Sequence, residues 1–252
     1  MLTVGAVQAS ATCGDACAVR PGMKYLGGIG GIGGRAAASD EFFRGPRSSN
    51  REPAHETPRR SSMRTLISTA FVSLDGVMEA PGGEPGYRNS GWTFRDMEFL
   101  PEAYDIKGRE QREATAIVLG RASYQAFSPV WPDMEDFSAY KVMPKYVVST
   151  TLTDEDLVAN WGETTILRSL DEVAALKETE GGPIIVHGSA TLNRDLSDAG
   201  LIDRYHLLVF PLLLGAGKRL FSDTDKDTQK LTLVEHKAYA NGLQMNVFDV
   251  VR

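Results

Sequence analysis

The fold class of this 252-residue chain is decided by the stretch Pro183-Ile184-Ile185-Val186-His187-Gly188-Ser189-Ala190-Thr191-Leu192. The apolar, β-branched run that ends at His187 is typical of a strand buried on both faces. Gly188-Ser189 interrupts this run, and the segment from Ala190 to Ser197 has the pattern of a helix. A buried strand followed directly by a helix predicts an α/β protein with a largely parallel sheet.

The same alternation of strand and helix patterns continues on both sides of this stretch. Further strands are predicted at Thr65–Ser73, Ala116–Leu119, Lys145–Ser149, Thr164–Leu167 and Arg204–Phe210. Helices are predicted at 98–112, at 121–127 and after the N-cap Ser169, which has Glu172 as its capping-box partner. The chain closes with Thr232–Ala240 and Leu243–Val250, joined at the hairpin signal Asn241-Gly242. We therefore expect helices around a mostly parallel sheet that ends in an antiparallel hairpin.

Residues 1–62 differ in composition from the remainder and are predicted to be a disordered extension of a single domain at 63–252. They contain ten of the 25 glycines, and they carry 8 Lys and Arg against 5 Asp and Glu, whereas residues 63–252 carry 19 against 28. Without strand or helix periodicity, such a segment cannot offset its ordering entropy by burial. A nucleotide-binding glycine loop, a transit peptide and a misassigned leader before Met63 are the alternatives.

The overall composition excludes several classes of protein. Hydrophobic residues make up 42% of the chain and charged residues 24%, as in ordinary globular proteins. A net charge of -6 and a pI near 5.3 argue against a nucleic-acid partner. No apolar run approaches the length of a membrane span, and the only cysteines, Cys13 and Cys17, lie in the first quarter. We expect a cytoplasmic protein without a membrane or metal site.

Two strand-to-helix junctions are the candidate ligand-binding sites. Gly120 and Arg121 follow one predicted strand, Gly188 and Ser189 follow another, and Ser149-Thr150-Thr151 forms a third polar strand end. In α/β sheets, ligands bind beyond the carboxyl ends of the strands, and phosphates favour helix N-termini. Each junction taken alone is also compatible with a plain helix cap. Together they predict an extended, phosphate-bearing ligand.

The order and spacing of the short motifs carry a family resemblance. The motifs are Ser73-Leu74-Asp75-Gly76, Leu119-Gly120-Arg121 with Tyr124, Tyr146-Val147-Val148-Ser149, Val186-His187-Gly188-Ser189, and Pro211-Leu212-Leu213-Leu214-Gly215-Ala216-Gly217 with Phe221. This combination resembles the dihydrofolate-reductase-like superfamily, and more closely the reductase domain of bacterial riboflavin-synthesis deaminase/reductases and their free-standing relatives. The resemblance covers residues 64–252. The zinc motif of the deaminase half does not occur in the sequence.

The resemblance implies a cofactor, a reaction and a set of site residues. The cofactor is NADP(H), with NAD(H) as the alternative, and the reaction is hydride transfer to a small heterocycle. The implied cofactor-binding residues are Gly120, Arg121, Tyr124, Ser149, Thr150, His187, Gly188, Ser189 and Leu192. The candidate substrate-binding residues are Asp75, Trp92, Pro211, Gly215 and Gly217, and Asp75 is also the candidate catalytic group.

Several of these residues have plainer alternatives. Asp75 precedes Gly76 and is also suited to shaping a turn. His187 at a strand end, His206 inside a strand and Trp92 in a loop are equally compatible with structural roles. Relatives often have an arginine after the strand that ends at Ser149, whereas here Thr150 follows. A preference for NADP(H) then rests on Arg121.

We therefore expect a reductase of the 5-amino-6-(5-phosphoribosylamino)uracil type. A dihydrofolate or pterin reductase and a non-catalytic cofactor-binding module on the same fold are the alternatives. We also expect a homodimer, because the apolar stretch from His206 to Leu214 and the closing hairpin extend the sheet toward an edge with few charges.

Overall fold

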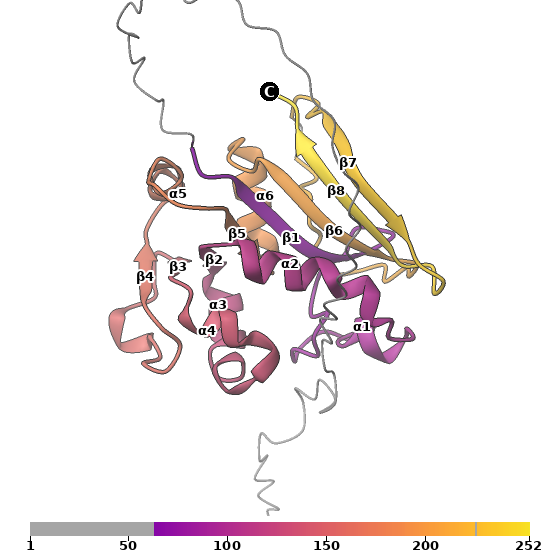
Figure 1. The fold of residues 1–252 in the computed structure, drawn as a ribbon, viewed down its shortest axis with the longest axis horizontal. Coiled ribbons are helices and arrows are strands. Elements are labelled where there is room, and N and C mark those ends of the chain that lie inside the picture. The colour runs from indigo at the N-terminus through magenta and orange to yellow at the C-terminus, as the bar shows by residue number, and fades with distance from the viewer. Residues whose placement is uncertain (1–62, 225) are drawn as a thin grey trace, which may run out of the picture.

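A computed structural model describes residues 63–224 and 226–252, so the predictions for residues 1–62 lie outside the described residues. An eight-stranded sheet runs through the molecule in the order β4-β3-β2-β5-β1-β6-β8-β7 (Figure 1). The strands are β1 Leu66–Ser73, β2 Ala116–Gly120, β3 Lys145–Val148, β4 Thr164–Leu167, β5 Ile184–His187, β6 Arg204–Phe210, β7 Leu231–Ala238 and β8 Gln244–Val250.

The strands from β4 to β6 in this order pair in parallel, and β8 and β7 continue the sheet in antiparallel pairing. The helices are α1 Trp92–Arg95, α2 Asp105–Glu113, α3 Arg121–Phe127, α4 Ser138–Val142, α5 Leu170–Lys177 and α6 Ala190–Asp198. Four 3-10 helices, Pro101–Tyr104, Trp131–Asp133, Glu135–Phe137 and Asp154–Asp156, complete the elements. This arrangement confirms the predicted fold class.

Helices cover both faces of the sheet, because the alternate side chains of each buried strand point to opposite sides. On β1, Leu66, Ala70 and Val72 pack into the core cluster that contains the apolar residues of α5 and α6. Ile67, the neighbour of Leu66, packs into the cluster formed with α3 and α4. Figure 1 shows α2, α3 and α4 in front of the sheet and α6 behind it.

The first predicted helix is wrong in its extent. A helix over 98–112 was expected, but the chain forms a 3-10 turn at Pro101–Tyr104 and α2 begins only at Asp105. Pro101 occupies the first position of the 3-10 turn, where its missing N–H costs least, and it could not lie within a longer helix without losing a hydrogen bond. The predicted N-cap of α5 is confirmed: the Ser169 hydroxyl accepts a hydrogen bond from the Glu172 amide at 3.3 Å.

Of the two segments expected to extend the sheet toward its open edge, the closing hairpin forms that edge and the stretch from His206 does not. The segment His206–Phe210 belongs to β6, which pairs with β1 on one side and with β8 on the other. The edge near the C-terminus is β7, the first strand of the predicted closing hairpin, and every residue of this strand is exposed. Any pairing of two copies along this end of the sheet would therefore involve β7.

Candidate functional site

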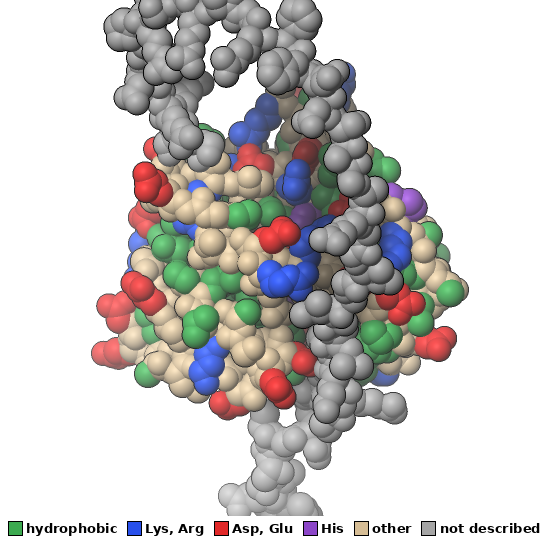
Figure 2. Space-filling view, in the orientation of Figure 1, with side chains coloured by type: hydrophobic (Ala, Val, Ile, Leu, Met, Phe, Trp, Pro, Cys, Tyr) green, Lys and Arg blue, Asp and Glu red, His purple; other side chains and the backbone are tan. Residues whose placement is uncertain are grey.

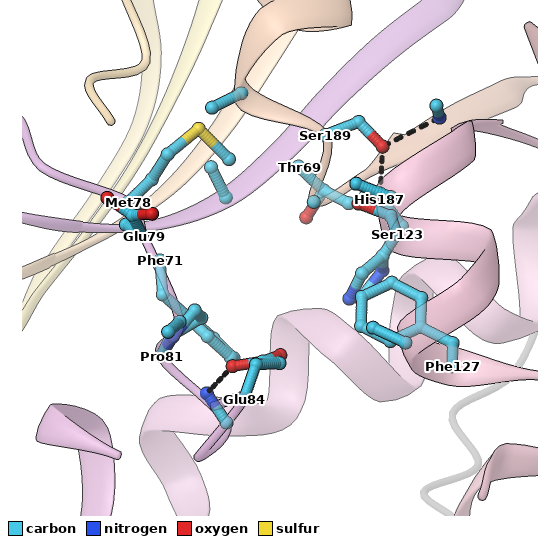
Figure 3. Close-up of a pocket in the computed structure, with 18 of the residues that line it drawn as sticks. Thr69, Phe71, Met78, Glu79, Pro81, Glu84, Ser123, Phe127, His187 and Ser189 are labelled. Atoms are coloured by element: carbon cyan, nitrogen blue, oxygen red, sulfur yellow. Dashed lines mark hydrogen bonds between the residues drawn. The ribbon is translucent and has the colours of Figure 1, made fainter. Parts of the chain in front are cut away.

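A cavity of about 1880 Å³ opens where the parallel strands end. Small-molecule sites usually occupy roughly 300–1,000 Å³, so this cavity has room for two ligands side by side. In Figure 3 the loop from Met78 to Glu84 forms one wall, and Ser123, Phe127, His187 and Ser189 form the opposite wall. The cavity thus lies at the carboxyl ends of the strands, where the sequence predicted a ligand.

Ser189 connects the two predicted strand-to-helix junctions. As the N-cap of α6 it has φ 64 and ψ 59, a left-handed conformation that is uncommon for a residue with a side chain. Its hydroxyl accepts a hydrogen bond from the Gly120 amide at 2.8 Å (Figure 3). The Gly120 amide is therefore engaged within the protein. The first turn of α6, whose amides have no partners within the helix, is the better anion-binding group.

Two glycines allow close packing at these junctions. A Cβ on Gly120 would lie 3.4 Å from the Cβ of Ser189 and 3.6 Å from that of Leu192, and both of these residues line the cavity. Gly188 has φ +61, and a Cβ there would lie 3.1 Å from the Ser123 hydroxyl. Both glycines line the cavity, so backbone atoms form this part of its wall, which we call the glycine notch, and a ligand such as a dinucleotide phosphate can approach them.

Two arginines line the cavity near the ends of β2 and β4. The predicted Arg121 donates from Nη1 to the Thr151 hydroxyl at 2.6 Å. Arg168, which the sequence analysis missed, donates from Nη1 to the carbonyl oxygens of Ser149 at 2.8 Å and Leu152 at 2.7 Å. Arg168 directly follows the predicted strand Thr164–Leu167, and a basic residue at that strand end was the signal available in the sequence.

His187 presents a neutral imidazole at the end of β5. Burial, together with the positive charge of Lys107, lowers the pKa of His187 to about 3. The ring lies edge-on to Trp131 at a centroid distance of 4.9 Å, and Phe127 stacks on Trp131 at 4.1 Å. The His187 Nδ1 atom is buried and has no hydrogen-bond partner among the described residues. This wall of the cavity is aromatic and uncharged.

A buried ionic network, also missed in the sequence analysis, borders the cavity. Thr69 and Lys107 line the cavity, and behind them Glu110 accepts hydrogen bonds from the Thr69 hydroxyl at 2.8 Å and from His206 Nδ1 at 2.9 Å. Burial alone raises the pKa of Glu110, but the charge of Lys107 and the hydrogen bond from His206 outweigh it and hold this pKa at about 2. His206 is a buried partner of this carboxylate.

Three predicted cofactor-binding residues do not line the cavity. Tyr124 is fully buried, and its hydroxyl accepts a hydrogen bond from the Val158 amide at 2.9 Å. The Ser149 hydroxyl accepts hydrogen bonds from the amides of Thr151 and Leu152 and so closes the turn after β3, whereas Thr150 is exposed on that turn. Gly120, Arg121, His187, Gly188, Ser189 and Leu192 are the predicted residues that the fold does bring together around the cavity.

The predicted catalytic Asp75 lies outside the cavity lining. Its carboxylate accepts hydrogen bonds from the Ser73 hydroxyl at 2.6 Å and from the amides of Leu214 at 3.2 Å and Gly215 at 2.8 Å. Partial burial raises the pKa of Asp75, but these three hydrogen bonds outweigh it and lower the pKa. Asp75 therefore fixes a turn through these hydrogen bonds, and it is not among the residues that line the cavity.

The other predicted substrate-binding residues also lie outside this lining. Trp92 is fully buried, donates from Nε1 to the Glu79 carbonyl at 2.8 Å, and packs edge-on against Phe210. Pro211, Gly215 and Gly217 are exposed in the segment after β6. Trp92 thus belongs to the core that supports the Met78–Glu84 loop. This corrects the expectation that it walls the pocket.

Within 63–224 and 226–252, no three or more His, Cys, Asp or Glu residues gather as a metal site. None of the described helices is long and apolar enough to cross a membrane. On the face drawn in Figure 2, acidic and basic side chains of the described residues are interspersed, unlike the basic band of a nucleic-acid-binding surface.

Comparisons with known proteins place these features in context. A model of the RibD C-terminal domain matches residues 64–245. The uncharacterized protein YyaP of Bacillus subtilis is 28% identical over 192 residues, which covers 73% of this chain and 94% of YyaP. A solved protein assigned to riboflavin biosynthesis, from Shewanella sp. PV-4, superimposes with a TM-score of 0.59 at 18% identity and covers 75% of this chain and 99% of its own. A pyrimidine reductase-like protein from Corynebacterium diphtheriae gives 0.51 at 16% identity, with coverages of 79% and 97%.

Proposed function

The chain belongs to the RibD C-terminal domain family, and from this premise we propose that it is an NAD(P)H-dependent reductase of a small heterocyclic substrate. The observation that carries the proposal is the cavity at the strand ends, with the notch at Gly120 and Gly188 beside the N-terminus of α6. Its volume of about 1880 Å³ suits a dinucleotide and a second ligand together.

The residues around the notch have distinct roles in this proposal. The first-turn amides of α6, beginning after Ser189, bind the pyrophosphate. The guanidinium groups of Arg121 and Arg168 bind the 2′-phosphate, for which a planar fork of donors is well suited. When bound, the reduced nicotinamide supplies a hydride. The neutral His187 and the aromatic side chains beside it exclude water from the reacting atoms.

We propose a substrate of the 5-amino-6-(5-phosphoribosylamino)uracil type, with a folate or pterin as the second candidate. Phe71, Phe127 and Trp131 line the cavity and favour a planar ring. A panel of pyrimidine and pterin substrates, assayed by the absorbance of NADPH, tests the proposal. We expect NADPH to be consumed with at least one pyrimidine. NADPH that binds but is never consumed would instead identify a non-catalytic module.

Loss of either arginine is expected to weaken NADPH binding more than NADH binding, because only NADPH carries the 2′-phosphate. For Arg121→Ala and Arg168→Ala we expect the affinity for NADPH to fall about tenfold, equivalent to about 1.4 kcal/mol, and the affinity for NADH to change little. Fluorescence titration of both cofactors measures this difference. Arg112→Ala, at an exposed arginine outside the cavity lining, is the matched control. Equal weakening of NADPH and NADH would show that these side chains do not bind the 2′-phosphate.

We further propose a homodimer formed through β7. Leu233 is 52% exposed and Val234 is 48% exposed on this edge strand, and an unpaired apolar edge is a site of strand pairing. Sedimentation equilibrium of the full chain should give twice the monomer mass of 27.4 kDa. Leu233→Lys should shift the protein toward monomer, whereas Lys141→Ala, at an exposed residue of α4, should not. A wild-type mass of one chain at micromolar concentration would refute the dimer.

A further inference from the structure

Lys107 is a buried lysine whose ammonium borders the cavity. On α2 it lies three residues before Glu110, so both side chains project from the same face of the helix. Only 8% of the Lys107 side chain and 1% of the Glu110 side chain is exposed, and the ammonium lies 3.3 Å from the Glu110 Oε2 atom. Burial of a charge at this depth requires compensation. The carboxylate of Glu110 provides it.

The Lys107 ammonium can turn one of its donors toward a ligand. It donates to the Thr69 hydroxyl and, at 3.5 Å and 3.3 Å, to the Oε1 and Oε2 atoms of Glu110, and these two contacts with one carboxylate are long for hydrogen bonds. Lys107 also lines the cavity, beside the Phe71 ring, whose centroid lies 5.0 Å from Nζ. An N–H that exchanges one of these long contacts for an oxygen or nitrogen in the cavity is a strong donor, because the ammonium is charged and nearly desolvated.

The direction of the hydrogen bonds identifies which group of the network can release a proton. An ammonium has no lone pair, so the Thr69 oxygen must accept from Lys107, and the Thr69 hydroxyl proton must point to Glu110. His206 donates from Nδ1 to the same carboxylate oxygen. All three partners thus stabilise the anion, and the pKa of Glu110 is held at about 2. Burial lowers the pKa of Lys107 and makes its ammonium a better acid.

We propose that Lys107 binds the heteroatom of the reducible C=N or C=O group of the substrate and donates the proton that completes its reduction. The hydride from a reduced nicotinamide forms the new C–H bond, and the π electron pair moves to the heteroatom. The heteroatom then takes a proton from the Lys107 Nζ atom, which is left as a neutral amine and regains a proton from solvent. Glu110 is a positioning residue, and the inference rests on the proposed reductase function.

The network also defines the class of substrate. The charges of Lys107 and Glu110 cancel, and His187 nearby is neutral, so this part of the cavity has no excess positive charge. A phosphate here would meet at most one N–H of Lys107, for which it would compete with Glu110, and it would lose most of its hydration. A neutral, planar heterocycle with a carbonyl or imine group meets the same donor without that cost. We therefore place the ring of the substrate beside Lys107 and any phosphate elsewhere.

The test uses a pair of substitutions that keep the network neutral. Lys107→Met alone would leave the Glu110 carboxylate buried without its cation, so it is combined with Glu110→Gln. The probe is 5,6-diaminouracil, and its binding is measured by calorimetry beside that of NADPH. We expect the double variant to bind the probe about tenfold more weakly and NADPH unchanged. In wild-type protein labelled with ¹³C at the lysine Cε atoms, the Lys107 resonance is the one that is absent from the spectrum of Lys107→Arg. We expect this resonance to shift when the probe binds.

A matched control removes another buried ion pair. Lys177 and Asp203 form one away from the cavity, with 2.7 Å between the Lys177 Nζ and Asp203 Oδ2 atoms. Lys177→Met with Asp203→Asn should leave probe binding unchanged.

Glu110→Gln alone should shift the alkaline limb of the pH profile of single-turnover hydride transfer toward lower pH, because Glu110 raises the pKa of Lys107. The titratable or polar groups that face Lys107 and Glu110 are Thr69 on β1, His187 on β5 and His206 on β6.

Each outcome bears on one claim. Unchanged probe binding in the double variant, an unmoved Lys107 resonance, or no binding of the probe to the wild-type protein would overturn the role of Lys107, even if NADPH is still oxidised. Failure of NADPH to bind the wild-type protein would overturn the proposed function. The calorimetric and resonance tests of Lys107 do not depend on NADPH, so the two failures can be told apart.

Discussion

Gly188→Val is expected to weaken NADPH binding by roughly 100-fold, the equivalent of about 2.7 kcal/mol. Gly188 has φ +61, and a Cβ at this position would lie 3.1 Å from the Ser123 hydroxyl and 3.3 Å from the Phe127 ring. The branched side chain of valine would displace these neighbours, both of which line the cavity, and so change the shape of the site at the start of α6. Fluorescence titration with NADPH measures the loss.

The matched control separates backbone strain from the effect on the site. Gly200 has φ +67, is exposed, and has nothing within 4 Å of a Cβ built on it. Gly200→Val should therefore lose about 1–2 kcal/mol of stability through left-handed strain and keep full NADPH affinity. If Gly188→Val does not fold, Gly188→Ala serves in its place. Retained affinity in a folded Gly188 variant would place the cofactor elsewhere.

Glu110→Ala is expected to give the largest loss of stability of any substitution considered for this protein. It leaves Lys107 buried without its counter-ion and His206 without its acceptor, and breaking a buried pair typically costs about 3–5 kcal/mol. Denaturant unfolding at neutral pH measures the loss. Glu113→Ala, at an exposed position of the same helix, should change stability by no more than about 0.5 kcal/mol. Equal losses at the two positions would contradict the ionic network.

The pH dependence of this loss has a defined sign. The pKa of Glu110 falls from 4.5 to about 2 on folding, so its contribution to stability is fully present above the unfolded value. That contribution disappears as the pH falls through the pKa of Glu110 in the folded protein, which is about 2. The stability difference between wild type and Glu110→Ala should therefore narrow on acidification below about pH 4.5. A difference that stays constant down to about pH 2 would show that the carboxylate is not held in its charged form.

The fold was predictable because its signals are local. The buried run before His187, the break at Gly188-Ser189 and the Asn241-Gly242 turn each specify their own segment, and the strands they bound appear in the sheet. The match to the RibD C-terminal domain confirms the family resemblance read from the motifs. Gly120 and Gly188 both line the cavity, because the carboxyl ends of parallel strands meet at one edge.

The ionic network could not be predicted, because its members come from elements distant in sequence. Thr69 lies on β1, Lys107 and Glu110 on α2, and His206 on β6, and only the packing of α2 against the sheet brings them together. A Lys and a Glu three residues apart on a helix usually form an exposed pair.

The orientation of Asp75 could not be predicted for the same reason. It follows β1 in sequence, but its carboxylate turns toward Leu214 and Gly215 and not toward the cavity. Sequence position at a strand end identified the correct region of the molecule. It did not specify the direction in which the side chain points, which is set by backbone amides more than a hundred residues away.

The most direct test of the reductase assignment follows the hydride itself. NADPH deuterated at both C4 positions of the nicotinamide is incubated with the full-length protein and 5-amino-6-(5-phosphoribosylamino)uracil, and the product is analysed by mass spectrometry. We predict a reduced product that carries one deuterium on carbon in the wild type, with the label greatly diminished in Gly188→Val. A wild-type protein that binds NADPH but transfers no deuterium to this substrate or to any pyrimidine or pterin of the panel would contradict the assignment.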